Sequence, residues 1–228
     1  MHSSALKSGY MQRLLCFIFL CLAPATAKAE PPHWQKDQIA RLIEWLDAAK
    51  DDGLGPAAAE SVTVRDALQT ADTQRLDSVA TAAAVGLLRA HRNGCCNASL
   101  RTGWHIDNGT ALTEPIAAVS DAVRRNRLDE LFGTARPSHP YYYSLRQAYA
   151  REVDPERRKT LAANLDRWRW MPRVLGERYL LVNTASFEAS LWDGRKEIGR
   201  WEVIVGKTGS PTPVFSARVT GVILNPWW

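Results

Sequence analysis

The chain has 228 residues, of which 46% are hydrophobic, 9% aromatic and 23% charged, and this composition excludes a disordered or collagen-like protein. The formal net charge is +5, but the first 29 residues carry Lys7, Arg13 and Lys28 without any acid, which leaves 26 cations against 24 anions in the remainder. A surface so close to neutral lacks the basic stripe that non-specific nucleic-acid binding needs, so no nucleic-acid partner is expected.

Residues 1–29 have the pattern of a cleavable secretory signal. Two cations precede the uncharged apolar segment 14–23, and Ala27 and Ala29 supply the small residues of a cleavage site. Ten helical residues cover about 15 Å, roughly half of a hydrocarbon core of about 30 Å, so this segment is too short to span a bilayer. We therefore expect cleavage after Ala29 and an exported chain without a stable membrane anchor.

Residues 30–172 have the apolar spacing and the start signals of helices. One apolar face runs over 39–46 and stops near Gly53, and another runs over 76–87 and stops near Gly94. Three further helices are expected to begin at Thr113, at Ser138 or His139, and at Asp154, each close before a proline. Residues between Gly94 and Thr113 are expected to form a loop.

After Gly176 the apolar period changes from that of helices to that of strands. Segments 178–183, 187–192, 197–205 and 214–224 are rich in β-branched and aromatic residues, which predicts four antiparallel strands. Asp193-Gly194 predicts a type I′ hairpin between the second and third strands. Helices followed by strands indicate the α+β fold class, not alternating βαβ units.

Cys95 and Cys96 are the cysteines that remain after cleavage of the signal. Adjacent cysteines cannot join distant segments, and a bond between them requires a strained eight-membered ring. Their spacing from His91 and His105 matches no standard zinc pattern, so no metal site is expected. We expect loop or buried thiols here, with oxidation of the pair in an oxidising compartment left open. The histidines at 33, 91, 105 and 139 are expected to be surface or capping residues.

Four motifs in the second half resemble the large Gram-negative L,D-transpeptidases, exported enzymes with a YkuD-type catalytic domain. They are NLDRWRWMP (164–172), GERYLLVNTASFEASLW (176–192), VIVGK (203–207), and TPVFS with NPWW (212–216 and 225–228). Upstream, GLGP (53–56), LDSVATAAAVGLLRAHRNG (76–94) and HPYYYSLRQAYA (139–150) resemble the helical scaffold domain of the same enzymes. The resemblance implies a signal peptide at 1–29, a helical scaffold domain at 30–172, and the incomplete first part of a β-sandwich catalytic domain at 176–228.

The resemblance implies a periplasmic enzyme that forms 3→3 cross-links between peptidoglycan stem peptides through a Cys acyl-enzyme, without a metal or an organic cofactor. The SHGCxR-like motif that carries the family's nucleophile does not occur in this sequence, and Cys95 and Cys96 match nothing in it. The resemblance therefore places no catalytic residue, and we expect the motif beyond Trp228 and the chain by itself to be inactive.

Thr212, Asn225 and Trp227 are the candidate residues for a substrate groove. A Thr-Pro strand entry and tryptophan packing between sheets explain the same residues without any substrate. If the chain ends at Trp228, the alternative is a non-catalytic periplasmic scaffold or peptidoglycan-binding protein.

Overall fold

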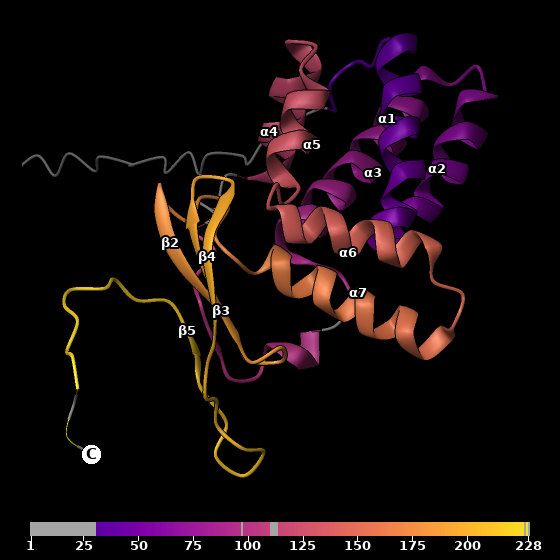
Figure 1. Cartoon of the computed structure of the whole chain (residues 1–228). Helices are drawn as coiled ribbons and strands as arrows, with labels where there is room; N and C mark the ends of the chain where they lie inside the picture. Colours follow the sequence, from indigo (N-terminus) through magenta and orange to yellow (C-terminus); the bar gives the residue numbers. More distant parts are fainter. Residues whose placement is uncertain (1–30, 97, 110–113, 226, 228) are drawn as a thin grey trace, which may run out of the picture. The chain divides into compact units, whose positions relative to one another are not determined.

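The computed structural model describes residues 31–96, 98–109, 114–225 and 227, so the expected signal peptide and Thr113 lie outside the described residues. Helices fill the first part and strands the second, which confirms the α+β expectation (Figure 1). The helices are α1 (Lys36–Ala48), α2 (Gly55–Leu68), α3 (Thr73–Asn93), α4 (Pro115–Arg124), α5 (Leu128–Ala135), α6 (Pro140–Arg151) and α7 (Pro155–Arg169), with 3-10 turns η1 (Ala49–Asp52) and η2 (Ala98–Arg101). The strands are β1 (Trp104–His105), β2 (Arg178–Asn183), β3 (Glu188–Asp193), β4 (Lys196–Glu202) and β5 (Val214–Phe215).

Two helices were not expected from the sequence. The buried residues of α2 include only small or β-branched side chains, among them Ala57, Ser61 and Val64, so its apolar face is weak in the sequence. Helix α5 has 8 residues, too few to show a clear period. Both helices are held by packing against neighbours that the sequence pattern does not reveal.

The helical core is built from α1 to α5. Small residues on α3, such as Ala80 and Ala84, are buried and let the neighbouring helices approach closely. The larger side chains that fill the core are at most 1% exposed, and they include Ile39 (1%) and Leu42, Leu46, Leu54, Leu87, Leu88 and Phe132 (0% each). Hydrophobic burial in this cluster is therefore the main term that stabilises the helical part. None of the described helices has the length and apolar character needed to cross a membrane.

Two of the expected helix starts are confirmed by side-chain caps. His139 precedes α6, and its Nδ1 accepts a hydrogen bond from the Tyr141 backbone N–H at 3.1 Å. Asp154 precedes α7 and accepts from the Arg157 N–H at 2.8 Å. Helix α4 begins with Glu114 at its N-cap and Pro115 in its first turn.

Strands β2, β3 and β4 form an antiparallel sheet in that order, as expected. Asp193 pairs with Lys196, so the two-residue hairpin loop is Gly194-Arg195, one residue later than expected. Gly194 has φ +56 and Arg195 is not among the residues with positive φ, which is the pattern of a type II′ turn and corrects the type I′ expectation.

The prediction of a fourth antiparallel strand over 214–224 is wrong in the length of the strand and in the strand with which it pairs. Only Val214–Phe215 forms a strand, β5, and it pairs in parallel with β1, in a segment expected to be a loop. Residues 216–224 include apolar and β-branched side chains but are exposed and form no strand in the structure. The physical reason is that strand propensity stabilises a strand only where a neighbouring strand supplies hydrogen bonds and packing.

A single guanidinium binds the C-terminal ends of three helices. Arg173 donates to the backbone carbonyls of His91 and Arg92 at the end of α3, of Ala135 at the end of α5, and of Arg169 and Met171 at the end of α7. Carbonyls in the last turn of a helix have no partner within the helix, and they carry the negative end of its dipole. Burial lowers the pKa of Arg173 to about 10, so this cation stays charged near neutral pH and satisfies all three ends.

We predict that Arg173→Met lowers the free energy of unfolding by about 2 kcal/mol, because it leaves carbonyls of three helix ends without a donor. Urea unfolding measures the effect. Arg157→Met, the same change at an exposed position of α7, serves as the matched control and should stay within about 0.5 kcal/mol of the wild type. Equal effects of the two substitutions would contradict this role of Arg173.

His91 is fully buried on α3, which corrects the expectation of a surface or capping residue. Neither ring nitrogen has a hydrogen-bond partner within the described part of the chain. Burial, followed by the nearby cations of Arg169, Arg136 and Arg173, holds the pKa of His91 well below its ordinary value. The folded protein therefore keeps this ring neutral, whereas the unfolded chain protonates it below a pH of about 6.5.

The folded state consequently loses stability as the pH falls below about 6.5, and His91→Leu removes this loss. We expect the stability of the variant relative to the wild type to grow by up to about 2 kcal/mol between about pH 8 and about pH 5. Urea unfolding at both pH values tests this, with exposed His105→Leu as the control without such a gain. A difference between wild type and His91→Leu that does not change with pH would refute the assignment.

Candidate functional site

Five aromatic rings from the start of α6, from α7 and from strands β2 and β3 contact one another. This aromatic junction consists of His139, Tyr141, Trp168, Tyr179 and Trp192. The His139 ring stacks on Trp168 with centroids 4.4 Å apart, and Trp192 of β3 meets Tyr141 edge-on at 5.3 Å and His139 at 4.5 Å. Aromatic pairs in these geometries add to the hydrophobic gain of burial, so the junction attaches the sheet to α6 and α7.

A polar network lies at the edge of the aromatic junction. The Tyr141 hydroxyl donates to Glu197 at 3.1 Å and accepts from Arg200 at 2.8 Å. Arg200 also pairs with Glu197 at 2.7 Å and with Glu188 at 3.1 Å. The hydrogen bond from Arg200 lowers the pKa of Glu197, and burial raises the pKa of Tyr141, so both groups keep their ordinary charge near neutral pH. One hydroxyl of α6 thus bonds to an anion and a cation of β4, Glu197 and Arg200.

His139 cannot act as a charged group or as a base through Nδ1. Its pKa is lowered to about 4, first by burial and then by the charge of Arg195. Because the neutral ring accepts a hydrogen bond at Nδ1, its proton is on Nε2, which has no partner among the described residues. This histidine therefore caps α6 and stacks within the junction, and it contacts no nucleophile.

Two cavities flank the segment from Pro172 to Val174. One of about 200 Å³ borders the aromatic junction, where Trp168, Tyr179 and Arg195 contribute to its lining. The other, of about 350 Å³, is lined in part by Arg92 and Thr134. Both have the size of a small ligand group, but neither is lined by a Cys or by a pair of acid and base side chains.

Among the described residues, no hydrogen bond connects the three predicted groove residues, Thr212, Asn225 and Trp227, with one another. The Thr212 hydroxyl accepts from the Gly206 N–H at 2.7 Å and so closes the turn before β5. Asn225 is exposed with φ +51, and Trp227 is fully exposed. Their assignment to a groove stays a prediction.

Cys95 and Cys96 form a disulfide with each other, which corrects the expectation of thiols. Both residues are exposed after the end of α3. No group of three or more metal-ligating side chains occurs among the residues that the structure describes. The sequence signal for the disulfide was the adjacency of the two cysteines. The aromatic junction was also missed, because its rings come from segments far apart in the sequence.

Two family models match the chain. The model of the scaffold domain matches residues 26–148, and the model of the L,D-transpeptidase catalytic domain, YkuD, matches residues 177–228. Helix α7 lies between the two matches. No curated protein and no solved structure matches the chain. The scaffold match covers more than half of the chain and a partial catalytic-domain match follows it, so the chain belongs to the L,D-transpeptidases that carry an N-terminal scaffold domain.

Proposed function

We propose that this protein acts in the periplasm as a peptidoglycan L,D-transpeptidase that forms 3→3 cross-links between stem peptides. The observation that carries the proposal is the match of residues 177–228 to the catalytic domain. In the proposed reaction a Cys thiolate attacks the stem tetrapeptide, the terminal D-Ala leaves and a thioester forms. The amine of a neighbouring stem then attacks the thioester and releases the thiol.

The proposed role of the described residues is to position the catalytic domain. Cys95 and Cys96 are bonded to each other and so offer no thiolate, and His139 is neutral with Nδ1 occupied. The aromatic junction and the network around Tyr141 instead hold β3 and β4 on the scaffold helices. A rigid platform of this kind supports catalysis because a displacement of about 1 Å at reacting groups lowers the rate strongly.

The second candidate function is a non-catalytic scaffold or peptidoglycan-binding protein of the periplasm. The observation that favours it is that the two cysteines among the described residues, Cys95 and Cys96, are bonded to each other and offer no thiolate. The two functions differ in the chemistry of the cell wall. A transpeptidase changes the bonds between stem peptides, whereas a binding protein leaves them unchanged.

Muropeptide analysis of cells with and without the gene separates the two functions. We expect deletion to lower the fraction of 3→3 cross-linked dimers and reintroduction of the gene to restore it, with mass spectrometry as the readout. The strain should lack its other L,D-transpeptidases, so that they do not mask the loss. An unchanged fraction in that background, together with sedimentation of the purified protein with sacculi, would contradict the transpeptidase and favour the binding protein.

The 228-residue chain by itself should not react with a carbapenem, the inhibitor class to which the family responds, because it lacks the SHGCxR-like motif. Intact mass spectrometry after incubation measures this. A mass increase of one drug molecule would show that a nucleophile lies within this sequence and would contradict the assignment.

The positioning role predicts that Tyr141→Phe loosens the sheet, because the hydroxyl that connects α6 to Glu197 and Arg200 of β4 is lost. We expect a destabilisation of about 1 kcal/mol and faster amide hydrogen exchange in β3 and β4, with the helical core unchanged. Tyr143→Phe is the matched control, since the Tyr143 hydroxyl makes no hydrogen bond within the described structure. Equal exchange rates in the two variants would argue against this contact.

A further inference from the structure

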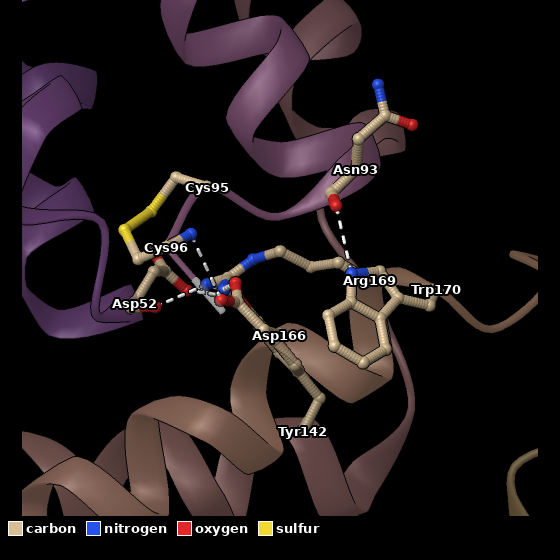
Figure 2. The surroundings of a disulfide bond; sticks show 8 residues. All are labelled: Asp52, Asn93, Cys95, Cys96, Tyr142, Asp166, Arg169 and Trp170. Atoms are coloured by element: carbon tan, nitrogen blue, oxygen red, sulfur yellow. Dashed lines mark hydrogen bonds and ion pairs between the residues drawn. A yellow bond between two sulfur atoms is a disulfide. The ribbon is translucent and has the colours of Figure 1, made fainter. Parts of the chain in front are cut away.

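The Cys95–Cys96 disulfide directly follows Gly94, the C-cap residue of α3, and Figure 2 shows it beside Asp166. Both cysteines are exposed, so a thiol group of another molecule can reach the sulfur atoms. The bond between the two neighbouring cysteines restricts the backbone dihedral angles of Cys95 and Cys96 more than two free thiols would. The state of the two sulfur atoms therefore decides how rigid this short segment is.

The same segment is attached to α7 by a hydrogen bond to Asp166. The Cys96 N–H donates to Oδ2 of Asp166 at 3.4 Å, and Oδ1 of Asp166 pairs with Arg169 at 2.7 Å (Figure 2). Arg169 is fully buried and also donates to the Tyr142 hydroxyl at 3.0 Å and to the Asp52 carbonyl. One carboxylate thus connects the exposed disulfide segment to the buried polar centre of the scaffold.

The end of α3 and the end of α7 lie so close together that a side chain does not fit at Gly94. Gly94 has φ +72, and a Cβ at this position would lie 2.7 Å from Oδ1 of Asp166 and 3.1 Å from Nε1 of Trp170. The Trp170 indole donates to the carbonyl of Asn93 at 2.9 Å, so it binds the last residue of α3. A change in the conformation of residues 95–96 is therefore transmitted directly to this contact between α3 and α7.

The surroundings do not favour a nucleophilic thiolate. The segment follows the C-terminal, negative end of α3 and adjoins the carboxylate of Asp166, and both disfavour a second negative charge. Catalytic cysteines need the opposite environment, a helix N-terminus or neighbouring cations. The pair is better suited to remain a disulfide until an external dithiol attacks it.

We propose that Cys95–Cys96 is a thiol–disulfide exchange site that controls how firmly the end of α3 is held on α7. The partner is a protein with a reactive dithiol, of the class that exchanges disulfides in exported compartments. One of its thiolates attacks one sulfur of the pair and forms a mixed disulfide, and the thiolate released on the neighbouring cysteine takes up a proton. The second partner thiol, as a thiolate, then releases the other cysteine, so two electrons pass to the pair and the partner becomes oxidised. The proposal does not rest on the transpeptidase function.

Differential alkylation of the purified full chain tests the site. Arg92 and Arg101 place both cysteines in the tryptic peptide 93–101, which separates them from Cys16 and Cys21. We expect this peptide to carry no alkyl group before treatment with a purified thioredoxin-like dithiol protein and two alkyl groups after it. Alkylation without the reductant, or no alkylation after it, would overturn the proposal.

Hydrogen exchange of the same two samples tests the control of the contact. We expect the amides from the last turn of α3 to Cys96 to exchange up to about tenfold faster after reduction, roughly the contribution of one hydrogen bond, with α1 unchanged. The variant Cys95→Ser/Cys96→Ser should behave as the reduced chain and should not respond to the dithiol. Full reduction without any change in exchange would refute the control of α3 by the disulfide.

Discussion

The guanidinium of Arg169 is excluded from solvent and keeps its charge, so the chain has to surround it with acceptors. Asp166, the carbonyl of Asp52 and the hydroxyl of Tyr142 provide them, and Tyr142 in turn donates to the Asp52 carboxylate at 2.7 Å. This single cation brings together η1, α6 and α7. An unpaired charge at this depth would cost several kcal/mol, and the three elements are therefore fixed relative to one another.

The sheet depends on the same constraint through α7. Trp168 directly precedes Arg169, and neighbouring residues of a helix lie about 100° apart around its axis, so the burial of Arg169 also sets the direction of Trp168. Trp168 stacks on His139, which meets Trp192 of β3. Two residues after Arg169 also attach α7 to the helical core, since Trp170 and Arg173 donate hydrogen bonds to the last carbonyls of α3. The segment 168–173 of this chain thus joins the helical core to the strands that follow it.

Helices α1 and α3 could be predicted from their apolar period, and α4, α6 and α7 from a capping residue close before a proline. The antiparallel sheet of β2, β3 and β4 could also be predicted from the sequence. Helix α2, with its small buried side chains, and the pairing of β5 with β1 could not, since both depend on partners distant in the sequence. The NLDRWRWMP motif indicated the family, but not that Asp166 binds the segment after α3, that Trp170 binds the end of α3, or that Arg169 binds η1 and α6. The aromatic junction and the Asp166 contact of Cys96 are likewise properties of the folded chain.

Aromatic contacts fix the first strands of the catalytic domain on helices α6 and α7. Nuclear Overhauser effects between the Trp192 indole of β3 and the rings of Tyr141 and His139 in the full chain test this attachment. We expect cross-peaks between Trp192 and both rings, because their centroids lie 5.3 and 4.5 Å apart. Cross-peaks within the helical core and within the sheet, but none between these rings, would show that the strands are only tethered and not fixed.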